Sequence, residues 1–244
     1  MQKEQYTIIE NYMLSCMEKD TAHDKEHVYR VLCTALDIAQ TEENVNYDVL
    51  ICACLLHDIG RQKQLENPKL CHAQVGAEKA CQFLRKHGFC EDFCMHVKEC
   101  IQTHRYRKGN PPDSIKAKIL FDADKIDVSG AVGLARTLAY KGQHNEPLYS
   151  RKADGSISDG TNDAESSFFQ EHKYKLEHIY DKFYTTRGAA IAKQRQSAAI
   201  SFYNSMLQEI RSSYESGIQY ASTASYNQMH AQKTHLLSEA KSSF

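Results

Sequence analysis

Apolar residues recur at three- and four-residue spacings through most of this sequence, and no segment shows the two-residue alternation of a half-buried β-strand. The chain has only four prolines and eleven glycines, so few positions interrupt the pattern. The pattern predicts helices over residues 4–17, 24–40, 47–58, 72–87, 91–105, 113–123, 127–141, 165–183 and 187–214. The expected fold class is therefore all-α, a single compact bundle of many helices.

Two polar segments divide this helical pattern. Residues 142–164 carry a proline, three glycines and several short polar side chains, which predicts one long loop of the kind that serves as a lid. The chain becomes polar and serine-rich after Gly217, as in a loosely held helix or a disordered end. We expect one domain over residues 1–215 and a polar C-terminal tail over 216–244.

Composition narrows the class of protein. Thirty basic residues oppose 31 acidic ones, so no global field favours nucleic acid or an anionic membrane as partner. The start of the chain lacks a signal peptide, and the longest apolar run, residues 49–56, is too short to span a bilayer. We expect a cytoplasmic protein without a membrane partner, whose apolar long helix and tail are compatible with a homodimer.

Nine cysteines all lie between Cys16 and Cys100. An odd number of cysteines in a chain without an export signal argues against a disulfide framework. The two closely spaced pairs, Cys52 with Cys54 and Cys90 with Cys94, lack the CxxC spacing of a zinc knuckle. We expect reduced thiols that pack as small hydrophobic side chains.

Histidines and aspartates gather at four places on the predicted helices. They are His23 and His27 on one helix face with Arg30 a turn later, the pair His57-Asp58 at the end of an apolar helix, the separate His72 and His104, and the acidic run Asp122, Asp124 and Asp127. A single histidine or acidic run usually satisfies ordinary polar needs or caps a helix. Two imidazoles combined with two carboxylates are a ligand set for manganese, iron, nickel, cobalt, zinc or, less well, magnesium.

Three sequence motifs resemble those of the HD superfamily of metal-dependent phosphohydrolases: AHDKEHVYRV, LLHDIGR and KILFDADKIDVSGAVGLAR. The resemblance covers about residues 20–215 and is nearest to the small stand-alone bacterial HD proteins. It implies an HD-domain bundle whose divalent metal is held by His27, His57, Asp58 and Asp124. Asp122 and Asp127 are the competing choices for the last ligand.

The remaining polar residues are expected to act on the substrate. We favour one metal, with His72 and His104 contacting phosphate or acting as general acid; the alternative is a second metal at these histidines. Arg30 and Lys125 are the preferred phosphate-binding cations because each lies beside a ligand, and Asp58 is expected also to steer the water. Further candidates are Arg61, Arg105 and Lys108 as cations, Asp24 as a carboxylate that orients a histidine, and Arg151 and Lys152 on a closing loop.

The resemblance implies a small phosphorylated substrate, a nucleotide first of all. We rank hydrolysis of a nucleoside triphosphate to monophosphate and pyrophosphate first, then a nucleotide monoesterase, then a cyclic phosphodiesterase. The HD-GYP motif is absent, and residues 57–62 do not match the HDxxED form of guanosine tetraphosphate hydrolases. Two other classes stay open: a di-iron HD oxygenase and a non-catalytic nucleotide-binding module.

Overall fold

The computed structural model describes residues 1–17, 24–105 and 109–241, with side chains as far as residue 223. The described chain is helical, and its β-structure is limited to one bridge between Arg151 and Ile157. The all-α prediction is confirmed. The helices are α1 (Lys3–Cys16), α2 (Lys25–Ala39), α3 (Tyr47–Leu56), α4 (Arg61–Glu66), α5 (His72–Lys86), α6 (Glu91–Thr103), α7 (Ile115–Ile126), α8 (Gly130–Gln143), α9 (Phe168–Tyr174), the 3₁₀ helix η1 (Leu176–Asp181) and α10 (Thr186–Lys241).

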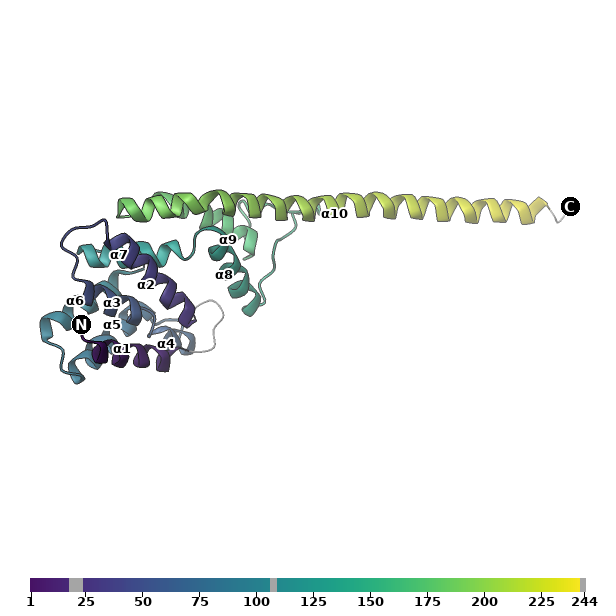
Figure 1. The fold of residues 1–244 in the computed structure, drawn as a ribbon. Helices are drawn as coiled ribbons and strands as arrows, with labels where there is room; N and C mark the ends of the chain where they lie inside the picture. The colour runs from purple at the N-terminus through teal and green to yellow at the C-terminus, as the bar shows by residue number, and fades with distance from the viewer. Residues whose placement is uncertain (18–23, 106–108, 242–244) are drawn as a thin grey trace.

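The main bundle forms around α3, which contacts α1, α2, α5, α6 and α7 (Figure 1). Its residues are apolar on all sides, so the helix is stable only when neighbours cover every face. Three of these helices begin at a polar side chain that accepts a hydrogen bond from the backbone N–H three positions further on. The capping residues are Asp24 for α2, Asn46 for α3 and Ser114 for α7. These caps fix where α2 and α7, the helices that carry the first and last predicted ligands, begin.

A second, smaller core joins α8, α9, η1 and α10. Its buried members are Leu134, Phe168, Phe169, Leu176, Ala199 and Tyr203. The N-terminal part of α10 also contacts α7, so this second unit lies directly against the main bundle. Hydrogen bonds join α10 and its preceding turn to α7. The Tyr184 and Thr185 backbone N–H groups and the Thr185 hydroxyl donate to Asp122, and Arg195 donates to the Ile126 carbonyl.

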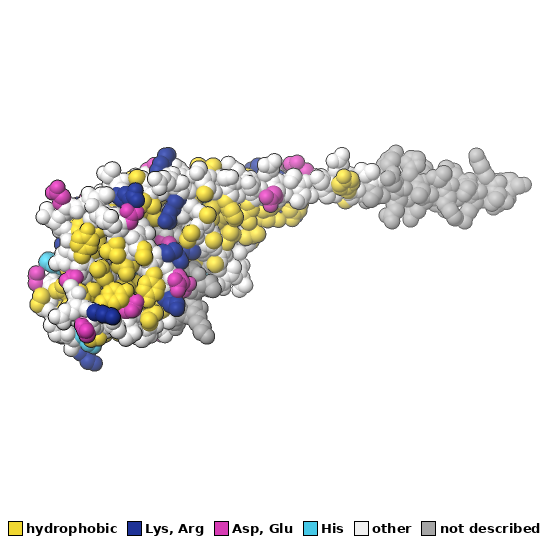
Figure 2. Space-filling model, viewed as in Figure 1, with side chains coloured by type: hydrophobic (Ala, Val, Ile, Leu, Met, Phe, Trp, Pro, Cys, Tyr) yellow, Lys and Arg dark blue, Asp and Glu magenta, His cyan; other side chains and the backbone are white. Residues whose placement is uncertain are grey.

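Helix α10 passes over α7 and α8 and then projects well beyond the rest of the chain (Figure 1). The helix predicted over residues 187–214 therefore continues to Lys241. Hydrophobic side chains lie along the lower edge of α10 where it passes the second core, whereas the described part further out is mostly neither charged nor hydrophobic (Figure 2). The domain boundary expected at residue 215 coincides with no break in this helix and stays a prediction.

The structure differs from the predicted helices in three further respects. Helix α4 was missed because its sequence, RQKQLE, has no apolar stripe. The single helix expected over residues 165–183 is instead α9 followed by η1, because Lys175 leaves the α-helical backbone region. Helix α7 continues to Ile126, beyond the predicted end at residue 123, so Asp124 lies inside the helix instead of after it.

The remaining expectations of the fold concern loops, thiols and membranes. The segment that links α8 to α9 is an irregular loop, as predicted, and all nine cysteines are free. Burial raises the pKa of the Cys52 and Cys54 thiols well above the ordinary value, as befits inert core side chains. None of the helices in the described ranges combines the length and apolar character needed to cross a bilayer.

Candidate metal centre

His27 lies in the first turn of α2, and its imidazole is buried. Asp24 accepts a hydrogen bond from the His27 backbone N–H at 2.9 Å, so it caps the helix. The printed contact of Asp24 with His27 is thus to the backbone, and its role in orienting a histidine ring stays a prediction. The ring is instead held by Asp127, whose Oδ2 lies 2.7 Å from His27 Nδ1. This contact leaves His27 Nε2 facing the interior of the bundle.

His57 and Asp58 occupy the tight turn that follows α3. His57 Nδ1 lies 2.7 Å from the Cys54 carbonyl oxygen, which fixes the ring and turns Nε2 inward. The turn presses against α5: a Cβ atom on Gly60 would lie 2.2 Å from the His72 carbonyl oxygen and 2.6 Å from the Gly76 nitrogen. Only glycine permits this approach. The close packing brings Asp58 to His72, fourteen positions along the chain.

The three carboxylates of the acidic run point in different directions from the end of α7. Asp122 is buried and accepts hydrogen bonds from the Tyr184 and Thr185 backbone N–H groups and the Thr185 hydroxyl. Asp127 faces His27 Nδ1, on the far side of that ring from the other ligand atoms. Only Asp124 of the three turns its carboxylate toward His27 Nε2, and it keeps 23% of its side chain exposed.

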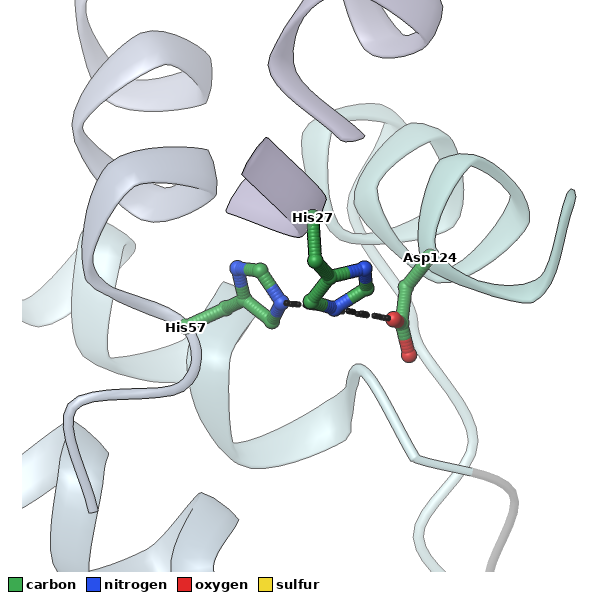
Figure 3. Close-up of side chains that lie close together, drawn as sticks. All are labelled: His27, His57 and Asp124. Carbon is green, nitrogen blue, oxygen red and sulfur yellow. Dashed lines mark hydrogen bonds and ion pairs between the residues drawn. The ribbon is translucent and has the colours of Figure 1, made fainter. Parts of the chain in front are cut away.

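The first cluster consists of His27, His57 and Asp124 (Figure 3). One oxygen of Asp58 lies beside these three side chains. His27 Nε2 lies 3.3 Å from His57 Nε2 and 3.4 Å from Asp124 Oδ1. Asp58 Oδ2 lies 3.5 Å from His27 Nε2 and 3.6 Å from His57 Nε2. Ligand atoms at about 2.0–2.2 Å from a shared cation lie about 3–4 Å apart, so these side chains fit a divalent metal.

The second cluster consists of the other Asp58 oxygen with His72 and His104. Asp58 Oδ1 lies 3.5 Å from His72 Nε2 and 3.8 Å from His104 Nε2. All three atoms are buried and have no hydrogen-bond partner within the described structure. A buried polar atom without a partner costs about 1–3 kcal/mol, so this group requires a bound species.

The opposite ring nitrogens define the chemistry of that second cluster. His72 Nδ1 contacts the Gln64 side-chain oxygen at 2.5 Å, and His104 Nδ1 contacts the Ile101 carbonyl oxygen at 2.6 Å. A carbonyl oxygen only accepts, so Nδ1 is the protonated nitrogen in both neutral rings. Both Nε2 atoms therefore offer a lone pair toward a carboxylate oxygen. The occupant that fits is a cation or a proton donor.

The two clusters differ in their affinity for protons. Burial lowers the pKa of His27, but hydrogen bonds to three carboxylates outweigh it and raise the pKa to about 10. Burial lowers the pKa of His72 to about 2 and that of His104 to about 4. Burial opposes ionisation of the Asp58 and Asp124 carboxyls. Arg61 and the histidines nevertheless hold the pKa of Asp58 below the ordinary range, and the histidines alone do so for the pKa of Asp124.

Two of the predicted cations lie at this centre. Arg61 donates from Nε to Asp58 Oδ2 at 2.5 Å, and its side chain is 28% exposed. Arg30 donates to both oxygens of Asp127 at 2.8 and 3.0 Å and is 39% exposed. Arg105 lies nearby, with Nη1 4.0 Å from Cys71 Sγ at the start of α5. Lys108 and His23 fall outside the described residues.

The structure does not bring Lys125 and Arg151 to the clusters. The Lys125 amine donates to the Lys182 carbonyl at 2.6 Å and lies over the Phe183 ring, on another face of α7 from Asp124. Burial lowers its pKa to about 8. Arg151 lies over the Tyr214 ring, against the outer half of α10.

Two residues that sequence reasoning missed complete the surroundings of the clusters. Arg136 on α8 is largely buried and lies 2.9 Å from Asp127 Oδ2. A single arginine among the small and apolar residues of that predicted helix was the available signal. Gln64 on α4, which orients His72, had no signal because its helix has no recognisable pattern.

Comparison with known proteins shows what this chain is similar to. Residues 25–129 match the family model of the HD domain. YpgQ of Bacillus subtilis is 24% identical over 194 residues, which cover 79% of this chain and 87% of YpgQ.

Solved structures with the same fold extend the likeness beyond that segment. The crystal structure of YpgQ in complex with ADP matches with a TM-score of 0.66 at 23% identity, over 84% of this chain and 98% of that one. A protein from an uncultured Thermotogales bacterium, described as a predicted HD superfamily hydrolase, matches with a TM-score of 0.56 at 28% identity, over 82% and 90% of the two chains. Residues 25–129 of this chain are similar to the HD domain, and the chain shares its fold with a protein described as a predicted HD superfamily hydrolase.

Proposed function

We propose that this protein is a divalent-metal-dependent phosphohydrolase whose metal is held by His27, His57, Asp58 and Asp124. The observation that carries the proposal is the first cluster together with Asp58. Four side chains from three distant segments of the sequence turn their ligand atoms to one buried point. When bound there, a divalent cation supplies Lewis-acid polarisation of a phosphoryl oxygen and a more acidic water.

The chain's own residues supply the remaining parts of such a site. Arg61 and Arg30 are both partly exposed and anchored by carboxylates of the centre, so their free edges are available to phosphate oxygens. Their positions support the roles expected from sequence for cations beside the ligands. The contacts of Lys125 give no support to a phosphate-binding role, and we leave it out of the proposed site.

The nucleotide preference rests on two supports. The HD-superfamily resemblance favours phosphate esters and anhydrides, and the related fold of YpgQ has been solved with ADP. Within this class we propose nucleoside triphosphates as substrates. Water would attack the α-phosphorus, the bond between that phosphorus and the α–β bridging oxygen would break, and pyrophosphate would leave with the bonding electron pair.

The second cluster favours acceptor roles over the general-acid role expected for its histidines. Both Nε2 atoms present lone pairs, so we propose that His72 and His104 accept hydrogen bonds from a water molecule in a one-metal centre. Metal analysis by inductively coupled plasma mass spectrometry should then give one equivalent. Two equivalents, with the second lost in His104→Gln, would make the second cluster a metal site and revive a di-iron oxygenase as the competing function.

The decisive experiment is a turnover screen on metal-stripped protein. Manganese, magnesium, cobalt, nickel or iron is returned separately, and ribo- and deoxynucleoside tri-, di- and monophosphates are offered. Asp58→Ala is compared with the exposed Asp113→Ala. Metal-dependent pyrophosphate release that is lost only in Asp58→Ala supports the proposal. Oxygen consumption without phosphate chemistry, or saturable nucleotide binding without turnover, would replace it with an oxygenase or a binding module.

A further inference from the structure

Asp127 is buried at the C-terminal end of α7 and is shared by three cationic or donor groups. Its Oδ2 lies 2.7 Å from His27 Nδ1 and 2.9 Å from Arg136 Nη1. Arg30 contacts both oxygens, at 2.8 and 3.0 Å. Arg136 also donates to the Asp127 backbone carbonyl at 3.2 Å. These partners occupy both carboxylate oxygens on the side of His27 that faces away from the first cluster.

This contact determines which nitrogen of His27 is available to a cation. A carboxylate behind Nδ1 holds the proton on that nitrogen and leaves the Nε2 lone pair for the ligand position. It also fixes the ring orientation and increases the donor strength of Nε2. Asp58 and Asp124 lie on the opposite, Nε2 side of the ring.

The two arginines explain why a carboxylate can be buried at this place. One carboxylate beside a neutral imidazole would be an unpaired buried charge, which is strongly unfavourable. Arg30 comes from α2, the helix of His27, and Arg136 comes from α8, which begins after the matched HD segment ends at residue 129. Helix α8 is pressed against the preceding turn, since a Cβ atom on Gly133 would lie 2.1 Å from the Val128 carbonyl.

We propose that Asp127, clamped by Arg30 and Arg136, is the positioning residue of His27 and not a metal ligand, so that α8 is a working part of the metal centre. The inference rests on the metal site of the proposed function. It assigns a role to an arginine outside the HD segment and links the second core to the site through one side chain.

The first test measures metal binding without any substrate. Manganese binding to metal-stripped protein is followed by isothermal titration calorimetry in wild type, Asp127→Asn and Asp37→Asn. Asp37 is the control for loss of an arginine-paired carboxylate, because it forms a two-point pair with Arg187 at 3.1 and 2.8 Å on the surface, with no histidine among its described contacts. Loss of an outer carboxylate typically weakens metal binding about 10–100-fold, which we expect for Asp127→Asn, with the control unchanged. Wild-type affinity in a folded Asp127→Asn protein overturns the inference.

The second test needs no variant and therefore holds even where Asp127→Asn fails to fold. Long-range ¹H–¹⁵N correlation spectra of the zinc-loaded wild type report which nitrogen of each histidine carries the proton. His27 should carry it on Nδ1; a proton on Nε2, or a metal-bound Nδ1, overturns the inference. Neither test uses a nucleotide. If the protein hydrolyses no nucleotide, the proposed function is refuted, but the two tests still decide whether Asp127 positions His27.

Discussion

Metal binding at the first cluster should release one proton from His27. In the metal-free protein burial opposes the charged ring, but three surrounding carboxylates raise the pKa of His27 to about 10, so the ring is an imidazolium at neutral pH. A cation that takes Nε2 must displace the proton on that atom. The carboxylate ligands Asp58 and Asp124 contribute no proton, because their pKa values lie below the ordinary range.

The magnitude follows from the distance between that pKa and the working pH. At pH 7.5 the difference of about 2.5 units corresponds to about 3.4 kcal/mol spent on deprotonation, at 1.36 kcal/mol per unit. Manganese affinity should therefore rise about tenfold per pH unit across the neutral range, since each unit lowers that cost equally. The slope should flatten only as the pH approaches 10, the value for His27.

Calorimetry in buffers of different ionisation enthalpy measures the released protons directly. Manganese is titrated at pH 7.5 in HEPES and in Tris, and the two apparent binding enthalpies should differ by the difference between the ionisation enthalpies of the two buffers, for one proton. The manganese affinity is also compared between pH 7.0 and 8.5. His144→Gln is the matched control, because His144 is exposed and bonds only locally to the Tyr140 carbonyl. No buffer dependence and a pH-independent affinity would show that His27 is neutral before the metal binds, and the reasoning from the three carboxylates would fail.

Four further predictions concern stability, measured by thermal and urea unfolding. Gly60→Ala should cost about 1–3 kcal/mol and weaken manganese binding, whereas Gly76→Ala, whose methyl would meet Gly60 N at 3.3 Å, should cost less. Metal-free protein should lose stability as pH rises from about 6.5 toward 10, because the pKa of His27 is raised in the folded state. It should also lose stability as pH falls below about 6.5, because the pKa of His104 is lowered to about 4, and His104→Gln should make that fall shallower. Asp122→Ala should cost about 1–3 kcal/mol by leaving the Tyr184 and Thr185 donors unpaired.

The sequence predicts helices well wherever one face of the helix is apolar. The pattern identified the helices that carry His27 and His72, and the helix that ends just before the His57-Asp58 pair, to within a few residues. It failed for α4, whose polar residues are positioned by contacts to the turn and to α5 and have no periodicity of their own. It also ended α7 too early, because an acidic run suggests a helix end unless distant partners for its carboxylates are known.

Side-chain direction was the information that the sequence lacked. Asp122, Asp124 and Asp127 are equivalent as letters, and only the packing of α7 against α2, α8 and the start of α10 gives them separate partners. The same limit applies to Lys125, which is adjacent to Asp124 in sequence but turned by about 100° on the helix, toward Lys182. Adjacency on a helix is therefore a poor guide to adjacency at a site.

The position of Asp58 explains why a histidine–aspartate pair at the end of an apolar helix is so informative. Its Oδ2 faces the first cluster and Arg61, while its Oδ1 faces His72 and His104. One carboxylate thus joins the helices α2, α5 and α6 to the turn after α3, at a place where burial of an unpaired charge would be strongly unfavourable. Because Asp58 is fully buried, the bundle tolerates it only through these partners together with whatever occupies the clusters. The negative charge of Asp58 is therefore what attracts a cation to the site. The fold alone does not satisfy that charge completely, because Asp58 Oδ1 is buried without a hydrogen-bond partner in the described structure.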